Sequence, residues 1–198
     1  MKNIFCVFTL CTFWSFVYSE CPVIVSRDEW GAVPPMNEEK LKQPIDLVII
    51  QHTVVYGTCD TDEACAKIAK QTQELHMKVR HFWDIGMSFL VGGNGKVYEC
   101  RGWNYIGAHT HGYNYDSYGI SFMGNFNVDT PTDKMIEAAK NLIQCGVDAG
   151  HIGKDYHVVG HRQVTPTESP GEKLYHEIQS WPHYLADTSS IAKNLTKS

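Results

Sequence analysis

The chain has little of what several classes of protein require. Its 17 Lys and Arg residues are outnumbered by 22 Asp and Glu, a formal net charge of -5 at pH 7, whereas a protein that wraps nucleic acid needs a concentrated basic face. Sixteen Gly and eight Pro in 198 residues are too few for a collagen-like or mucin-like chain, and 43% apolar residues are too many for a disordered one. We therefore expect one globular domain with no nucleic-acid partner.

The first nineteen residues have the pattern of a secretory signal peptide. Lys2 gives a short basic start, 4–17 is apolar and almost uncharged, and the residues up to Ser19 suit cleavage before Glu20. The apolar run is shorter than the roughly 20 residues that a membrane-spanning helix requires. No later stretch is long and apolar enough to span a bilayer. The sequence therefore predicts a signal peptide over 1–19, an extracellular protein and no membrane span.

Histidine and cysteine are frequent, with ten His and seven Cys, an inventory that at first suggests a metal enzyme. Two of the cysteines lie in the leader, which leaves five in an oxidising compartment where thiols tend to pair. Cys59 and Cys65 flank a polar loop before a helix and are close enough in sequence for a local disulfide. A bridge from Cys21 to Cys145 would tie down the mature N-terminus and leave Cys100 unpaired, but the sequence alone leaves other pairings open.

Hydrophobic patterns along the chain alternate between those of strands and those of helices. Strands are predicted at 46–51, 118–123 and 156–160, a hairpin with an Asn94-Gly95 turn at 88–98, and helices at 62–78, from Thr130 to just before Gly150, and at 174–181. This order predicts the α/β class: a single domain over 20–185 with a central mixed β-sheet flanked by about three helices. A polar tail follows over 186–198, and its Asn194 lies in a glycosylation acceptor sequence.

Short motifs are spread along most of the chain. They are Ser26-Arg-Asp-Glu-Trp-Gly31, Asp84-Ile-Gly86, Phe89-Leu-Val-Gly92, Val97-Tyr-Glu99, Arg101-Gly-Trp103, Gly107-Ala-His-Thr110, Gly160-His-Arg162, Pro170-Gly171, Leu174-Tyr175 and Trp181-Pro-His183. In order and spacing, from about Cys21 to Tyr184, they resemble the peptidoglycan recognition protein family. The resemblance implies the fold of the type 2 N-acetylmuramoyl-L-alanine amidases, with an open groove that holds the peptide stem of bacterial cell wall.

In catalytic members of that family, two His and one Cys hold a zinc ion, and a Tyr and a Thr or Lys assist hydrolysis of the lactyl amide. The resemblance places the first ligand His on Gln51, the second on His161 and the ligand Cys on Ser169. The Tyr position falls on Met87, and Thr167 keeps the Thr position.

These replacements argue against catalysis. An amide oxygen and an unactivated hydroxyl are weak zinc ligands compared with imidazole and thiolate, so Gln51 and Ser169 should leave no tight zinc site. Met87 cannot donate a hydrogen bond to a tetrahedral oxyanion. We expect a protein that is not an enzyme and needs no cofactor or metal. A zinc-dependent amidase with weak or residual activity is the alternative.

Three other reactive arrangements are weaker. His109 and His111, two apart on a strand, would share a face and could hold a second metal, but they could equally be solvated or line the groove. Ser169 and His161 would need an orienting acid to act as a nucleophile pair. An odd, half-buried cysteine such as Cys100 is more often inert than nucleophilic.

The polar and aromatic side chains that remain suit binding. Hydrogen-bond donors and flat rings on a concave wall match a ligand of sugar, lactyl and amide groups. His76 and Arg80, at i and i+4 on a helix, could instead face solvent. The residues predicted to contact peptidoglycan are Gln51, His52, His76, Arg80, His81, Phe82, Met87, Arg101, His109, Thr110, His111, Asn114, His161, Thr167 and Ser169.

Two features bear on whether the preferred stem is of the diaminopimelate or the lysine type, and they disagree. Family members that prefer diaminopimelate carry Gly-Trp before Asp-Ile-Gly and an Arg before the later Gly-Trp, whereas lysine-preferring members carry Asn-Phe and no Arg. This chain has His81-Phe82, which matches neither, and Arg101, whose guanidinium can pair with the extra carboxylate. The balance leans slightly to diaminopimelate, because an unpaired carboxylate costs more than a modest change of shape.

Together these patterns predict a secreted immune recognition protein that binds bacterial peptidoglycan without hydrolysing it and triggers signalling through protein partners. Direct killing of bacteria by membrane disruption fits the net acidic charge poorly.

Overall fold

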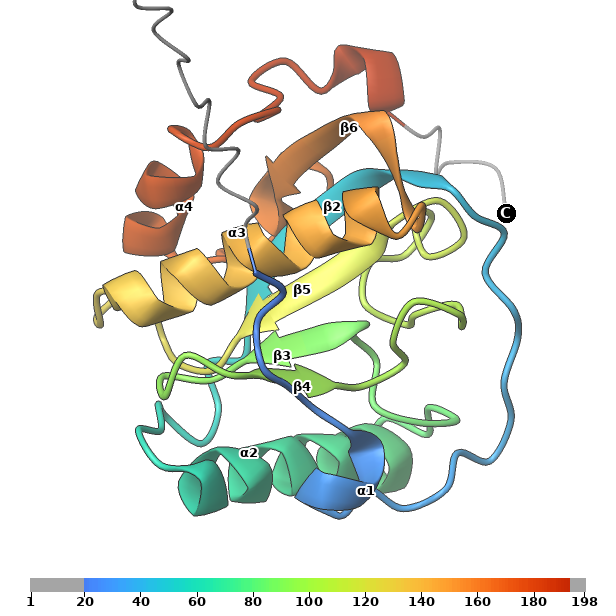
Figure 1. Cartoon of the computed structure of the whole chain (residues 1–198), viewed down its shortest axis with the longest axis vertical. Helices are drawn as coiled ribbons and strands as arrows, with labels where there is room; N and C mark the ends of the chain where they lie inside the picture. The colour runs from blue at the N-terminus through green and yellow to red at the C-terminus, as the bar shows by residue number, and fades with distance from the viewer. Residues whose placement is uncertain (1–19, 193–198) are drawn as a thin grey trace, which may run out of the picture.

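A mixed sheet forms the centre of the molecule. The computed structural model describes residues 20–192 (Figure 1), so the expected signal peptide and Asn194 lie outside the described residues. In the described part six strands pair in the order β1-β4-β3-β5-β2-β6. Their bounds are β1 Ile24–Val25, β2 Ile45–His52, β3 Phe89–Val91, β4 Val97–Glu99, β5 Tyr118–Phe122 and β6 Ile152–Gly160. β3 and β4 form an antiparallel hairpin and the other neighbouring pairs are parallel, which confirms the mixed α/β prediction.

In the part of the chain that the structure describes, four α-helices accompany the sheet: α1 Arg27–Trp30, α2 Asp62–Glu74, α3 Asp133–Asp148 and α4 Glu172–Ile178. α2 continues into a π-helical turn, η1 (Leu75–Val79), and short 3-10 turns occupy η2 (His161–Gln163) and η3 (Ser189–Ile191). No helix within residues 20–192 is long and apolar enough to cross a membrane.

Local capping explains where the helices depart from the predicted bounds. α1 was not predicted; its four residues form because Ser26 and Glu29 make a reciprocal capping box. α3 begins at Asp133 rather than at Thr130, since the hydroxyl of Thr132 accepts a hydrogen bond from the backbone N–H of Met135. β6 also begins earlier than predicted, at Ile152, because exposed residues near its start hide the apolar pattern of the strand.

The two faces of the sheet carry separate cores. In β3, Phe89 and Val91 pack with α3 and α4 in one large cluster, whereas Leu90 between them packs with α2 in a second. Figure 1 shows α3 lying across the sheet with α4 beside it, and α1 and α2 together on the other side. Leu185 and Ile191, near the end of the described chain, cover the neighbouring part of β2. The groove lies on this second face of the sheet, between the part covered by α2 and the part covered by Leu185 and Ile191.

Two disulfides hold loops against this framework. Cys21 is bonded to Cys145 and Cys59 to Cys65, and Cys100 is free and buried, which confirms the pairing favoured from the sequence. Burial raises the pKa of the Cys100 thiol, so the thiol stays protonated at neutral pH and is a poor nucleophile.

Candidate functional site

The carboxyl end of β2 opens onto a cavity of about 530 Å³, which we call the central groove. Gln51 of β2 and Ser121 of β5, which pair in register, supply its floor. Its walls come from α2 with η1 and from the segment that follows β6. Nine of the predicted residues line it: Gln51, His52, His76, Arg80, Met87, His109, His161, Thr167 and Ser169.

Gln51 and Ser169, at the positions expected for two zinc ligands, are both tied to neutral protein groups. The amide nitrogen of Gln51 donates to Thr110 Oγ1 at 3.0 Å and to the carbonyl oxygen of His109 at 3.2 Å. Ser169 Oγ accepts a hydrogen bond from the backbone N–H of His52 at 3.2 Å. Both side chains are buried, so these bonds fix their orientation.

The ring of His109 is clamped by two glycines. A Cβ atom at Gly107 would come within 2.3 Å of Cδ2 of the ring, and one at Gly119 within 2.5 Å of Cγ. The turn beyond is closed by Asn114, whose side-chain oxygen accepts from the backbone N–H groups of His109 and Thr110 at 2.9 and 2.8 Å. Glycine at both positions is therefore required for the ring to reach the groove.

Two buried polar atoms of the groove have no hydrogen-bond partner in residues 20–192, namely Nε2 of His109 and Oγ of Ser121. Leaving such a group unpaired costs about 1–3 kcal/mol.

On the opposite wall, His76 is held by the loop before β3. Its Nδ1 accepts a hydrogen bond from the backbone N–H of Gly86 at 2.9 Å, so the neutral ring carries its proton on Nε2. His76 lies in the π-helical turn η1, a kind of turn that is frequent at functional sites. His76 is buried and Arg80 is exposed, and both line the groove.

Burial keeps the histidines of the groove uncharged. It lowers the pKa of His52 and of His161 to about 4. It lowers the pKa of His76 to about 4, with a further contribution from Arg80, and that of His109 to about 3, with a further contribution from His161. At pH 7 the groove therefore presents four neutral imidazoles rather than four cations.

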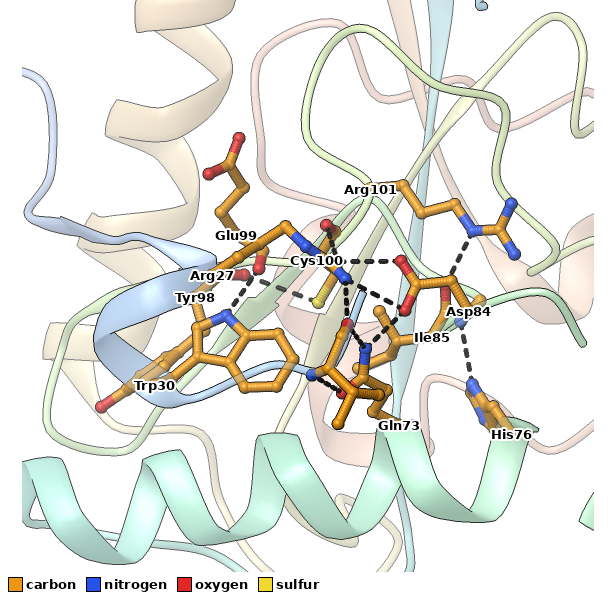
Figure 2. A network of polar contacts seen from close by, with 12 residues as sticks. Arg27, Trp30, Gln73, His76, Asp84, Ile85, Tyr98, Glu99, Cys100 and Arg101 are labelled. Atoms are coloured by element: carbon orange, nitrogen blue, oxygen red, sulfur yellow. Dashed lines mark hydrogen bonds and ion pairs between the residues drawn. The ribbon is translucent and has the colours of Figure 1, made fainter. Parts of the chain in front are cut away.

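A second cavity of about 280 Å³, which we call the side pocket, meets the central groove at Ala108. Its lining includes the predicted residues His81, Phe82, Arg101 and Asn114. Arg101 donates from Nε to the carbonyl of Ile85 at 2.8 Å (Figure 2). Its Nη1 donates to the carbonyl of Ile106, also at 2.8 Å. Within residues 20–192 its Nη2 makes no hydrogen bond, so this nitrogen can still donate to the carboxylate of a ligand.

The residues present do not fit a zinc ion. Of the three positions at which the family resemblance predicts zinc ligands, only His161 has an imidazole, whereas Gln51 and Ser169 offer an amide and a hydroxyl that already make protein hydrogen bonds. Zinc sites use imidazole, thiolate and carboxylate ligands. In residues 20–192 no group of three or more His, Cys, Asp or Glu is placed to hold a metal ion.

Two of the predicted contact residues line neither cavity. Thr110 is buried, and its hydroxyl accepts a hydrogen bond from Gln51. His111 is exposed. The expectation that His109 and His111 share a strand face is wrong, because 108–116 forms bends and turns, in which alternate side chains do not point the same way.

One end of the groove was missed from the sequence. It is lined by Val54 and Val55 after β2 and by Asn125, Asn127 and Glu168. Val54 has φ 63°, strained for a β-branched residue, and its N–H donates to the carbonyl of Gly124 at 2.9 Å. Asn127 donates to Glu168 Oε2 at 2.9 Å. Valines and amides in loops carry no distinctive sequence signal, so only the fold shows that they meet here.

Comparisons with known proteins agree with the motifs. Residues 41–172 match the family model described as N-acetylmuramoyl-L-alanine amidase. A peptidoglycan recognition protein of Trichoplusia ni is 54% identical over 169 residues, which cover 85% of this chain and 92% of that relative. The bumblebee PGRP-SA structure has a TM-score of 0.82 and 46% identity, and the match covers 84% of this chain and 99% of that one. A structure of peptidoglycan recognition protein-LE in complex with tracheal cytotoxin, described as monomeric diaminopimelic acid-type peptidoglycan, has a TM-score of 0.81 and 41% identity, with 82% and 96% covered.

Proposed function

The chain belongs to the peptidoglycan recognition protein family and has its amidase-like fold, and from this membership and the geometry of the groove we propose that it binds the muramyl peptide of bacterial peptidoglycan without hydrolysing it. The observation that carries this proposal is the hydrogen bonding of Gln51 and Ser169. Both lie where the motifs predict zinc ligands in catalytic relatives, and both are held by neutral protein partners in a groove of neutral histidines. This arrangement supports recognition of amides and hydroxyls rather than activation of water on a metal.

The two ends of the site favour one orientation of the ligand. A muramyl peptide has its sugar at one end and the carboxylates of its stem at the other. We place the stem toward the side pocket, where Arg101 supplies a fixed cation. The sugar then lies toward Val54, Val55 and Asn127, whose aliphatic and amide groups suit the apolar and hydroxyl faces of a sugar.

Arg101 also supports the preference for a diaminopimelate stem. A diaminopimelate residue differs from lysine by one carboxylate, and a buried guanidinium that is held by two carbonyls can pair with it without further ordering. The relative that was solved with tracheal cytotoxin binds a ligand of this type. His81 and Phe82 line the same pocket and set its shape.

We further propose that the protein acts outside the cell and triggers immune signalling. The two disulfides of the described residues are the kind that persist in an oxidising compartment, and the leader pattern of 1–19 is typical of secretion.

Binding and hydrolysis are separated by two measurements on the wild-type protein purified without chelator. Isothermal titration calorimetry with a diaminopimelate-type muramyl tripeptide should give a saturable complex, and elemental analysis should find no stoichiometric zinc. An amidase assay with added zinc should release no stem peptide. Stoichiometric zinc together with release of the stem would establish the amidase instead, and the absence of any binding would overturn the proposal.

A further inference from the structure

A buried carboxylate lies directly behind the side pocket. Asp84 is 3% exposed and receives a two-pronged contact from Arg27, whose Nη1 lies 2.8 Å from Oδ2 and whose Nη2 donates to Oδ1 at 3.2 Å. Gln73 of α2 donates to Oδ1 at 2.6 Å. Figure 2 shows these side chains converging on Asp84 from α1 and α2. The carboxylate is therefore fully occupied by one cation and one amide.

Arg101 stands between this carboxylate and the ligand pocket. It lines the side pocket on one side and, on the other, a small cavity of about 50 Å³ that Arg27, Asp84 and Cys100 also line. Arg27 also fixes the backbone immediately before Arg101, because its Nη1 donates to the carbonyl of Cys100 at 2.6 Å. Asp84 precedes Ile85, whose carbonyl accepts from Arg101 Nε.

The charge of Arg101 is not matched by any ion pair among the described residues. Its hydrogen bonds go to neutral carbonyls, and no carboxylate lies within ion-pair distance of its guanidinium in residues 20–192. Burial lowers its pKa, and the negative charge of Asp84 is the main opposing influence. Glu38, which also lines the small cavity, is exposed, so water screens its charge.

These contacts give Arg27 a role beyond stability. A carboxylate as buried as Asp84 needs a cation nearby, and both Arg27 and Arg101 border it. We infer that Arg27 is a positioning residue for stem recognition: it occupies the carboxylate of Asp84 and so leaves the guanidinium of Arg101 free to face the side pocket. Without Arg27, Asp84 draws Arg101 away from the pocket. This inference rests on the proposed function, because it assumes that Arg101 receives the carboxylate of the stem.

The test is the ratio of the affinities for diaminopimelate-type and lysine-type muramyl tripeptides, measured by calorimetry. Arg27→Gln should reduce the preference for diaminopimelate about tenfold, the size of a lost charge-assisted contact. Asp84→Asn keeps the acceptor for Gln73 but removes the charge that competes for Arg101, so the preference should be kept. The double variant Arg27→Gln/Asp84→Asn should regain it. A purely structural role predicts no such rescue.

The outcomes separate this inference from the proposal on which it rests. If the wild type binds neither tripeptide, the proposed function fails. If the wild type prefers diaminopimelate but Arg27→Gln keeps that preference, or the double variant does not regain it, the positioning role of Arg27 is wrong and binding stands. If the wild type binds both tripeptides equally, Arg101 does not read the stem and the inference is overturned. Should Arg27→Gln fail to fold by circular dichroism, Asp84→Asn decides alone: loss of its preference contradicts the inference, and retention supports it.

Discussion

The central groove and the side pocket each contain buried polar side chains at the point that we expect to meet the ligand, but the two cavities treat charge in opposite ways. In the groove, burial lowers the pKa of His52 and of His161 to about 4, and an amide and a hydroxyl stand at Gln51 and Ser169. In the side pocket, Arg101 stays charged beside an ion pair between Arg27 and Asp84. The difference teaches that two adjoining cavities can suit different parts of one ligand, since neutral imidazoles, an amide and a hydroxyl pair with neutral polar groups, whereas a fixed guanidinium pairs with an anion.

Restoring metal ligands to the groove should have the largest effect. The triple variant Gln51→His/Met87→Tyr/Ser169→Cys adds one imidazole, a thiolate and a hydrogen-bond donor at the positions that the motifs predict, and His161 supplies the second imidazole. We expect about one zinc per chain, because the free energy of binding zinc to such a ligand set is on the order of 10 kcal/mol near neutral pH. Elemental analysis after dialysis measures it.

The matched control is Gln51→His/Met87→Tyr, which lacks the thiolate and should bind zinc far more weakly. A triple variant that folds normally and yet holds no more zinc than this control would show that the ligand positions are assigned wrongly.

The second largest effect should be a loss of folding stability when the pH is lowered. A histidine with a folded pKa near 4 and an ordinary unfolded pKa near 6.5 binds its proton more readily in the unfolded chain. The stabilisation from these groups is therefore complete above about pH 6.5, declines as the pH falls toward 4 and does not change further below that. We expect urea unfolding to show a loss on the order of a few kcal/mol between pH 7 and pH 4.5.

His52→Asn isolates one histidine, since the amide oxygen can replace Nδ1 as the acceptor for the backbone N–H of Phe126 and does not titrate. Its pH dependence should be shallower than that of the wild type, whereas His111→Asn, at an exposed position, should leave the slope unchanged. Equal slopes for His52→Asn and the wild type would contradict the burial of a neutral imidazole at this position.

The smallest effect should come from a substitution in the side pocket, and it should lower the affinity for only one of the two stem types. Arg101→Ala removes the guanidinium that can pair with the extra carboxylate of diaminopimelate, so affinity for that stem should fall about tenfold. Affinity for the lysine-type stem should change by less than about twofold. Calorimetry with the two tripeptides measures both, and an equal loss for both stems would mean that Arg101 only supports the pocket wall.

Much of the fold could be predicted from local patterns. The apolar run of β2, the Asn94-Gly95 hairpin and the amphipathic face of α3 each carry a signal within a few residues. The short α1 and the first residues of β6 could not, because a four-residue helix depends on its capping box and exposed strand residues have no clear period.

In the candidate site too, some residues could be predicted from local sequence and others could not. Gln51, His161 and Ser169 follow from motifs, since each sits next to recognisable residues. The strained Val54 and the Asn127–Glu168 bond do not, because they depend on loops that only the folded sheet brings together. Neither does the role of Asp84, whose partners Arg27 and Gln73 lie on two different helices.

Native mass spectrometry of the wild-type protein with a diaminopimelate-type muramyl tripeptide and added zinc tests the central claim most directly. We predict a complex whose mass equals the protein plus the intact ligand, without zinc, and no free stem peptide after prolonged incubation. Release of the stem peptide with a zinc-bearing protein peak would contradict the account, because the groove would then cleave the ligand that we propose it only binds.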